Sequence, residues 1–220
     1  MSHPLLTGNR PAVVLAPMAG ITNRPYRQLC REASAELYPH GGAALYVSEM
    51  ITSRALIERD AETLRMTQFG DFESPRSIQL YGVDPQIVGA AVAMIVEEDR
   101  ADHIDLNMGC PVPKVTKKGG GSALPWKRDL FRAIVRAAVE NAQGKVPITV
   151  KMRKGIDPEH LTFIDAGLAA AEEGVAWVAL HGRTALDLYS GSADWSSIKE
   201  LKDALRPLNV PVLGNGDVWG

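Results

Sequence analysis

The segments HIDLN (His103–Asn107), DLFRAIVRAAVEN (Asp129–Asn141) and ITVKM (Ile148–Met152) predict a strand, a helix and a second strand in succession. The first and third are short runs rich in apolar residues, whereas the second repeats its apolar residues at helical spacing. Two strands joined through a helix in this way form a parallel pair with a right-handed crossover. This stretch therefore predicts an α/β protein built on a parallel sheet.

The same alternation extends along the chain in both directions. Five further strands are predicted: Val13–Ala16, Ala44–Ser48, Ser77–Leu80, Trp177–His181 and Val212–Asn215. Two more helices are indicated by their ends, because Asp84 with Pro85 suits a helix start (84–98) and Gly174 suits a helix stop (161–173). Seven strand–helix units predict a (β/α)8 TIM barrel, with residues 1–220 as a single domain. Such barrels need about 250 residues, so we expect this one to be truncated after the seventh strand.

Composition is that of an ordinary globular domain, with 45% hydrophobic and 23% charged residues. The formal net charge of −2 gives no overall signal for nucleic acid, so any RNA contact needs a local basic patch. Two distant cysteines, Cys30 and Cys110, indicate a reduced protein rather than a disulfide framework. The first 18 residues lack the pattern of a signal peptide, and no run approaches a membrane span. We therefore expect a cytoplasmic protein without membrane contact.

Polar residues are concentrated where the predicted strands end, which is where barrel enzymes place their active sites. The first strand is followed by Pro17-Met18-Ala19, the third carries Gln79, the fourth ends in Asn107-Met108-Gly109-Cys110, the fifth bears Lys151 and Arg153, the sixth ends in His181-Gly182-Arg183, and the seventh ends in Asn215-Gly216-Asp217. This clustering favours a site at the strand ends but does not specify one reaction.

Cys110 stands in a glycine- and lysine-rich loop (109–125) without a clear helix or strand pattern. We interpret this loop as exposed and mobile, which favours a reactive thiol over a buried hydrophobe. The run Gly119–Gly121 lacks the context of a phosphate-binding loop and is interpreted as flexibility. Cys30, among apolar neighbours of a helical pattern, is predicted to be a core residue.

Lys151 lies inside an apolar strand, where lysines are rarely buried without a partner or a role. A structural salt bridge is the alternative to a functional role. His181 also follows an apolar run, where a hydrogen-bonded core histidine is common. No second histidine or carboxylate stands at metal-ligand spacing from it, so no metal site is expected.

These motifs together resemble the dihydrouridine synthase family. The resemblance is carried by APMAGITNRPYR (Ala16–Arg27), by HIDLNMGCPVPKVTKKGGGSAL (His103–Leu124) and by the later VKMRKG, LHGRT and VLGNGDV. It covers nearly the whole chain in the right order, and the opening is similar to the bacterial B-type branch. The resemblance implies a TIM barrel that uses FMN, with NADPH or NADH as reductant, to reduce a uridine of tRNA to dihydrouridine.

The resemblance also implies roles for individual residues. Pro17, Met18 and Ala19 would line the FMN, Gln79 and Lys151 would hydrogen-bond its isoalloxazine edge, and His181, Asn215, Gly216 and Asp217 would hold the ribityl and phosphate side. Asn107 would orient the target uracil with help from Arg153. Cys110 would protonate C5 as a positioned general acid. Lys114, Lys117 and Lys118 would contact phosphates, although a merely solvated basic loop explains each lysine nearly as well.

Members of the family continue into an eighth strand and a helical tRNA-binding domain, both of which we expect to be missing before Gly220. Two alternatives remain open on the residues alone. One is another FMN barrel oxidoreductase acting on a free pyrimidine, similar to dihydroorotate dehydrogenase, which would not carry GCPVPKVTKKGGG. The other is an inactive RNA-binding fragment.

Overall fold

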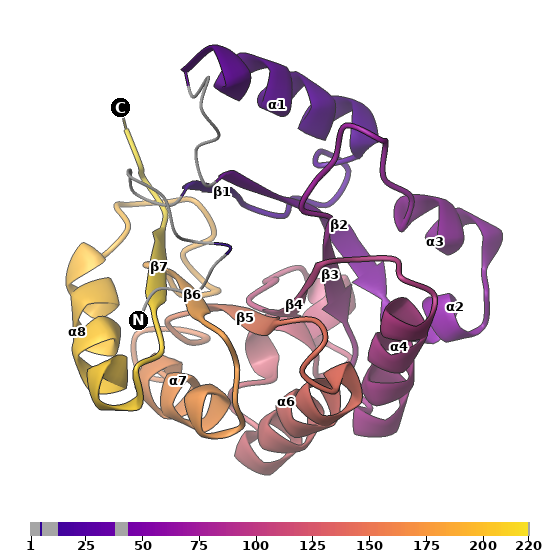
Figure 1. Ribbon diagram of the computed structural model, residues 1–220. Coiled ribbons are helices and arrows are strands. Elements are labelled where there is room, and N and C mark those ends of the chain that lie inside the picture. Colours follow the sequence, from indigo (N-terminus) through magenta and orange to yellow (C-terminus); the bar gives the residue numbers. More distant parts are fainter. Residues whose placement is uncertain (1–4, 6–12, 38–43, 220) are drawn as a thin grey trace.

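The computed structural model describes residues 5, 13–37 and 44–219. They form seven parallel strands, each paired with the next one along the chain (Figure 1). The strands are β1 (Val13–Leu15), β2 (Ala44–Thr52), β3 (Ser77–Tyr81), β4 (His103–Met108), β5 (Ile148–Arg153), β6 (Val178–His181) and β7 (Val212–Asn215). All seven predicted strands and the parallel sheet are thus confirmed. Most of the segment on which the signal-peptide expectation rested (1–4 and 6–12) lies outside the described residues.

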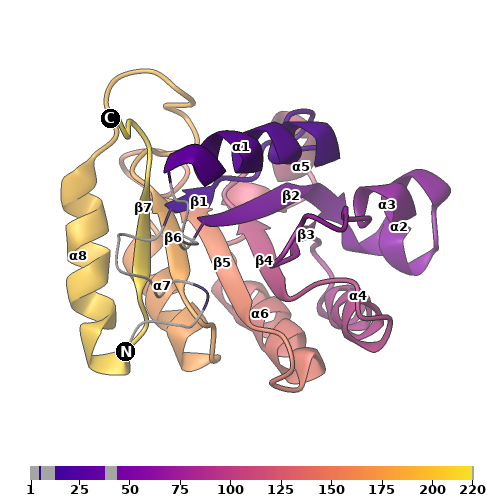
Figure 2. The same ribbon diagram turned by 45° about the horizontal axis from the view of Figure 1, so that its top comes forward.

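Helices follow the strands and cover the outer face of the curled sheet (Figure 2). They are α1 (Arg24–Leu37), α2 (Ser53–Ile57), α3 (Ala61–Met66), α4 (Pro85–Glu97), α5 (Pro113–Thr116), α6 (Arg128–Ala142), α7 (Phe163–Glu172) and α8 (Trp195–Leu205), with short 3-10 turns at Gly121–Ala123 and Arg206–Leu208. The three helices predicted from the sequence correspond to α4, α6 and α7. In the described part of the chain, no helix has the length and apolar character needed to cross a membrane.

The sheet curls so far that its first and last strands share one apolar cluster. Val14 of β1 and Leu213 of β7 both pack against the buried residues Leu45, Val47 and Trp177. Among the described residues β1 and β7 are not hydrogen-bonded to each other, so the sheet is a TIM barrel open between these two strands.

Side chains alternate along each strand between the helices and the barrel interior. In β4, Ile104 and Leu106 belong to the main core shared with the helices, whereas His103 and Asp105 face inward and line a cavity. The neighbouring strands β3 and β5 follow the same rule. This alternation lets the helices pack on an apolar outer face while polar side chains enter the barrel.

Helix α1 is held against the barrel by a buried ion pair. Arg27 donates from Nε to Glu73 Oε1 at 2.6 Å and from Nη2 to Oε2 at 3.0 Å, and both side chains are almost fully buried. A bidentate pair of this kind fixes direction as well as distance. Cys30, predicted to be a core residue, lies on α1 but is only partly buried, because this helix leaves neighbours such as Leu29 exposed.

Candidate functional site

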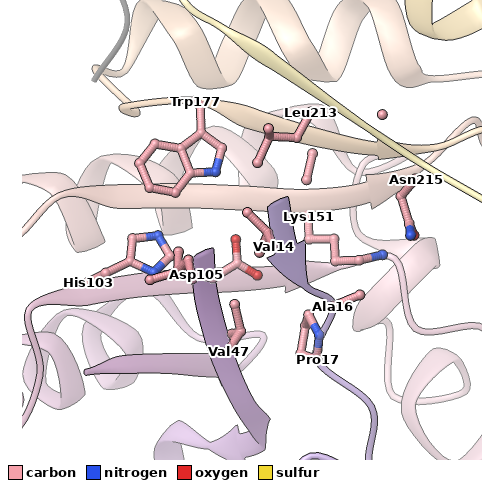
Figure 3. A pocket seen from close by; sticks show the side chains of 13 residues that line it. Val14, Ala16, Pro17, Val47, His103, Asp105, Lys151, Trp177, Leu213 and Asn215 are labelled. Atoms are coloured by element: carbon pink, nitrogen blue, oxygen red, sulfur yellow. The ribbon is translucent and has the colours of Figure 1, made fainter. Parts of the chain in front are cut away.

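A cavity lies inside the barrel and reaches the carboxyl ends of the strands. Three of the predicted site residues line it, namely Pro17 after β1, Lys151 on β5 and Asn215 on β7. Figure 3 shows Lys151 extending toward Pro17 and Asn215, with His103 and Trp177 at the opposite end of the cavity.

The Lys151 ammonium group is the cation that faces this cavity. Among the described residues it makes no ion pair within 4 Å and no hydrogen bond. Burial lowers the pKa of Lys151 to about 8, while the nearby Asp105 and Cys110 oppose that shift. The salt-bridge alternative for Lys151 therefore does not hold, and its charge is available to a ligand.

Asp105 is a buried carboxylate that the sequence reasoning missed. It is 4% exposed and accepts hydrogen bonds from Gln79 Nε2 at 2.8 Å and from Thr149 Oγ1 at 2.6 Å. Burial raises the pKa of Asp105, whereas these two hydrogen bonds and the charge of Lys151 act against that rise. The alternation of polar and apolar residues in HIDLN could have pointed to it, because it places Asp105 on the same face as Asn107.

Gln79 and Asn107, predicted to contact cofactor and substrate, contact each other. The Asn107 side chain donates from Nδ2 to Gln79 Oε1 at 2.9 Å, and Asn107 Oδ1 accepts from the backbone N–H of Cys110 at 2.9 Å. Gln79 is 1% exposed and sits between Asp105 and Asn107. The structure thus brings Gln79, Asn107, Cys110 and Lys151 to one region at the ends of β3, β4 and β5.

The loop that carries Cys110 is locally folded, although the sequence showed no clear helix or strand pattern there. It contains the short helix α5 and a 3-10 turn, and Ser122 donates its backbone N–H to the carbonyl of Cys110 at 3.0 Å. Gly121 has φ +56°, and a Cβ there would lie 2.3 Å from the Cys110 carbonyl oxygen. Gly121 therefore allows the close packing of this loop against the Cys110 carbonyl. The three lysines of the loop are exposed.

The Arg153 side chain hydrogen-bonds the backbone of the loop after β6. Its Nη1 donates to the backbone carbonyls of Thr184 at 2.7 Å and Leu188 at 3.0 Å. The next residue of that loop, Tyr189, is 81% exposed beside the Arg153 guanidinium. Arg153 therefore shapes the rim of the site through the backbone.

His181 is buried and neutral. Burial and the positive charges of Lys151 and Arg153 lower the pKa of His181 to about 3. Its Nε2 lies 3.4 Å from Arg183 Nη1, a donor, so that Nε2 is the acceptor nitrogen. A neutral imidazole at this strand end can accept or donate a hydrogen bond without carrying charge.

The turn after β7 divides its three predicted site residues. Asn215 lines the cavity, whereas Gly216 (φ +106°) packs against the His181 ring, where a Cβ would come within 2.7 Å of Cδ2. Asp217 accepts from Arg183 Nη2 at 2.8 Å and from the backbone N–H of Ala193 at 2.6 Å. Asp217 therefore fixes the turn beneath the site.

The loop after β1 holds Met18 and Ala19 beside Pro17. The Met18 carbonyl accepts from the backbone N–H groups of Ile21 and Thr22, each at 3.0 Å. Met18 is partly buried and Ala19 is exposed, and neither residue lines the cavity.

One group of possible metal ligands lies in the turn after β5. Asp157, Glu159 and His160 present ligand atoms within 4.8 Å of one another. The Asp157 carboxylate accepts from His160 Nδ1 at 2.7 Å and from the backbone N–H of Glu159 at 2.9 Å. These bonds close the turn and engage the carboxylate locally.

The chain matches known proteins over nearly its whole length. Residues 14–220 match the family model described as "Dihydrouridine synthase (Dus)". A "Probable tRNA-dihydrouridine synthase" of Mycobacterium tuberculosis is 57% identical over 208 residues, covering 94% of this chain and 53% of that protein. The "tRNA-dihydrouridine synthase B" of Pseudomonas syringae is 42% identical over 207 residues, covering 94% and 57%. The chain thus spans between half and three fifths of the length of these curated relatives. It belongs to the dihydrouridine synthase family.

Proposed function

We propose that the full-length protein carrying this chain is a tRNA-dihydrouridine synthase that reduces the C5–C6 double bond of a uridine in tRNA. The observation that carries the proposal is the cavity at the strand ends, where the unpaired Lys151 ammonium lies close to Cys110. The names of the relatives support the choice of tRNA as substrate. Because tRNA and reduced cysteines are both typical of the cytoplasm, we place the enzyme there.

The residues around the cavity fit FMN as the cofactor. The unpaired cation of Lys151 suits an electron-rich flavin edge, and Pro17 with the backbone of Met18 and Ala19 would line the ring. Neutral His181 and Asn215 would meet the ribityl chain, while Gly216 and Asp217 shape the turn that holds them. When bound, FMN would supply the hydride that adds to C6 of the uracil, after reduction by NADPH or NADH. The remaining amide N–H of Gln79 would complete the polar contacts.

The chain's own residues would complete the addition at the other carbon. Hydride addition at C6 leaves negative charge at C5 and O4, and this charge is neutralised when C5 takes a proton. Cys110 Sγ would donate that proton, and the thiolate would later recover one from solvent. Asn107 would orient the uracil edge, and Arg153 would act by holding the loop that carries Tyr189.

The target base must leave the tRNA fold to enter this cavity. The exposed lysines Lys114, Lys117 and Lys118 stand beside Cys110 in sequence and would contact the phosphates on either side of the flipped base. These three lysines would form the local basic patch that an RNA contact needs in a chain whose net charge is −2.

Two measurements on the full-length protein test the proposal. Heat-released cofactor identified by mass should be FMN, and incubation with NADPH and unmodified tRNA should convert one uridine to dihydrouridine in the nucleoside digest. Recovery of FAD would contradict the cofactor assignment. Turnover of free dihydroorotate without any change in tRNA would contradict the substrate.

A further inference from the structure

A chain of hydrogen bonds leads from the Cys110 backbone into the barrel, and the polarity of every link is fixed. The backbone N–H groups of Gly109 and Cys110 point at one atom of the Asn107 side chain, at 3.2 and 2.9 Å. Because backbone N–H groups only donate, that atom must be oxygen. The Asn107 amide nitrogen therefore faces Gln79 Oε1, and the Gln79 amide nitrogen faces Asp105 Oδ2.

A second chain reaches Asp105 from the amino-terminal ends of the strands. Thr149 Oγ1 donates to Asp105 Oδ1 at 2.6 Å, which uses its one proton. Thr149 must then accept from His103 Nε2 at 2.9 Å, so this nitrogen carries a proton. His103 Nδ1 in turn lies 2.7 Å from Ser77 Oγ. Both chains end on Asp105.

We infer that Asp105 is a positioning residue, which holds the Cys110 loop through Gln79 and Asn107. Asp105 accepts at Oδ2 from Gln79 and at Oδ1 from Thr149, so its carboxyl group terminates both chains at once. The charge of Lys151 favours the ionised carboxylate, against the effect of burial. Without the acceptor, Gln79 loses its orientation, Asn107 is free to turn, and the backbone N–H groups of Gly109 and Cys110 lose their partner. This inference rests on the proposed function, in which Cys110 is the acid.

Replacement of Asp105 by asparagine and replacement by alanine have different consequences. The amide introduced by Asp105→Asn can offer its oxygen to Gln79 and its nitrogen to Thr149, provided that the hydrogen bonds from Thr149 through His103 to Ser77 reverse their direction. Thr149 would then donate to His103, and His103 would donate from Nδ1 to Ser77, which each of these groups can do. Asp105→Asn therefore keeps the hydrogen bonds that run from residue 105 through Gln79 and Asn107 to the Cys110 backbone, whereas Asp105→Ala breaks them.

The test compares Asp105→Ala, Asp105→Asn and the control Ser77→Ala in the full-length protein. The first readout is hydrogen exchange at the Gly109 and Cys110 amides without tRNA, and the second is the rate of dihydrouridine formation. Asp105→Ala should speed hydrogen exchange at both amides at least tenfold. It should also slow dihydrouridine formation at least tenfold. Asp105→Asn should stay within about threefold on both readouts. Ser77→Ala removes only the last partner of the hydrogen bonds that run through Thr149 and His103. It should leave the amide exchange and the reaction rate unchanged.

Unchanged exchange in Asp105→Ala would overturn the inference, as would equal losses in Asp105→Asn and Asp105→Ala. If Asp105→Ala does not fold, Gln79→Met interrupts the same chain one link further on and is followed by exchange alone. Protected Gly109 and Cys110 amides in Gln79→Met would also overturn the inference. A wild-type protein that forms no dihydrouridine would contradict the proposed function, while the exchange result would still decide whether Asp105 holds the loop.

Discussion

The two halves of the barrel interior differ in kind. Strands β3, β4 and β5 point polar side chains inward, namely Ser77, Gln79, His103, Asp105, Asn107, Thr149 and Lys151. Strands β1, β2, β6 and β7 contribute mainly apolar ones, among them Val14, Leu45, Val47, Ala179 and Leu213, with Trp177 just before β6. The polar His181 and Asn215 stand at the last positions of β6 and β7. Barrels of this class usually fill the interior with bulky branched residues on all sides.

The difference shows how this barrel combines stability with reactivity. Burying polar groups is costly unless each one is hydrogen-bonded, and the polar half satisfies this through its two chains. In the described part of this polar half, the Lys151 ammonium lines the cavity without an ion pair or a hydrogen bond. The apolar half provides a wall against which a planar ring can pack.

The largest expected effect comes from Cys110→Ala at the open end of the polar half. Dihydrouridine formation should fall by about 10²–10⁴, the usual loss for a positioned general acid. The variant should keep its FMN and its reduction by NADPH, because the proton proposed to come from Cys110 is needed only in the reaction with the uracil. Single-turnover mixing of the pre-reduced enzyme with unmodified tRNA isolates this step.

Cys30→Ala is the matched control, since Cys30 is the other cysteine and lies on α1. It should react at the wild-type rate. Reoxidation by tRNA at the wild-type rate in Cys110→Ala would show that Cys110 is not the acid. Loss of FMN during purification would place Cys110 in the cofactor pocket.

Trp177→Ala should be the most damaging change in the apolar half. Trp177 is 2% exposed and stacks on His103 at 4.7 Å between ring centroids. Truncation of a buried aromatic residue costs about 3–5 kcal/mol of unfolding free energy. Urea denaturation should show this loss, and Trp219→Ala, which removes an 86% exposed side chain, should leave the transition within about 0.5 kcal/mol. Equal midpoints for the two variants would show that the apolar half does not stabilise the barrel.

Lys151→Met should weaken flavin binding without unfolding the barrel. It removes the unpaired charge but keeps the length of the side chain, so the fold should persist while flavin binding weakens about 10- to 100-fold. That range corresponds to one hydrogen bond to a charged group. Fluorescence titration of the flavin-free protein measures the affinity. Aggregation of Lys151→Met, with Lys199→Met on α8 remaining folded, would show that Lys151 has a structural role instead.

Much of the fold could be predicted because it depends on local patterns. Short apolar runs such as VVL and SIQL identify the strands, and polar residues at their ends identify one edge of the sheet. Helix α8 was not predicted, and for α1 the sequence indicated only a helical pattern around Cys30, although both helices are amphipathic. Asp194 caps α8 as the residue just before its first turn, a local signal that was overlooked, whereas Glu73 holds α1 from more than 40 residues away.

The site was predicted less completely, because its hydrogen bonds join distant segments. Gln79, Asp105 and Thr149 come from three strands, separated by 26 and 44 residues. Their partners cannot be known before the register of the sheet is known. The local fold of the Cys110 loop was not predicted, because a glycine run is compatible with both flexibility and close packing until a neighbour such as the Cys110 carbonyl is seen.

The smallest expected effect is a pH dependence of stability that belongs to Lys151 alone. Its pKa is about 8 in the folded protein and 10.5 in its ordinary state. Between these values the unfolded chain binds a proton that the folded chain does not, so the stability of the flavin-free protein should rise with pH. The slope cannot exceed about 1.4 kcal/mol per pH unit and should be smaller, because the side chain is partly exposed. Subtracting the same curve for Lys151→Met removes the contribution of all other groups. A difference that is flat from pH 8 to 10.5 would mean that the ammonium is stabilised in the folded state, and the polar half would then contain a partner for Lys151.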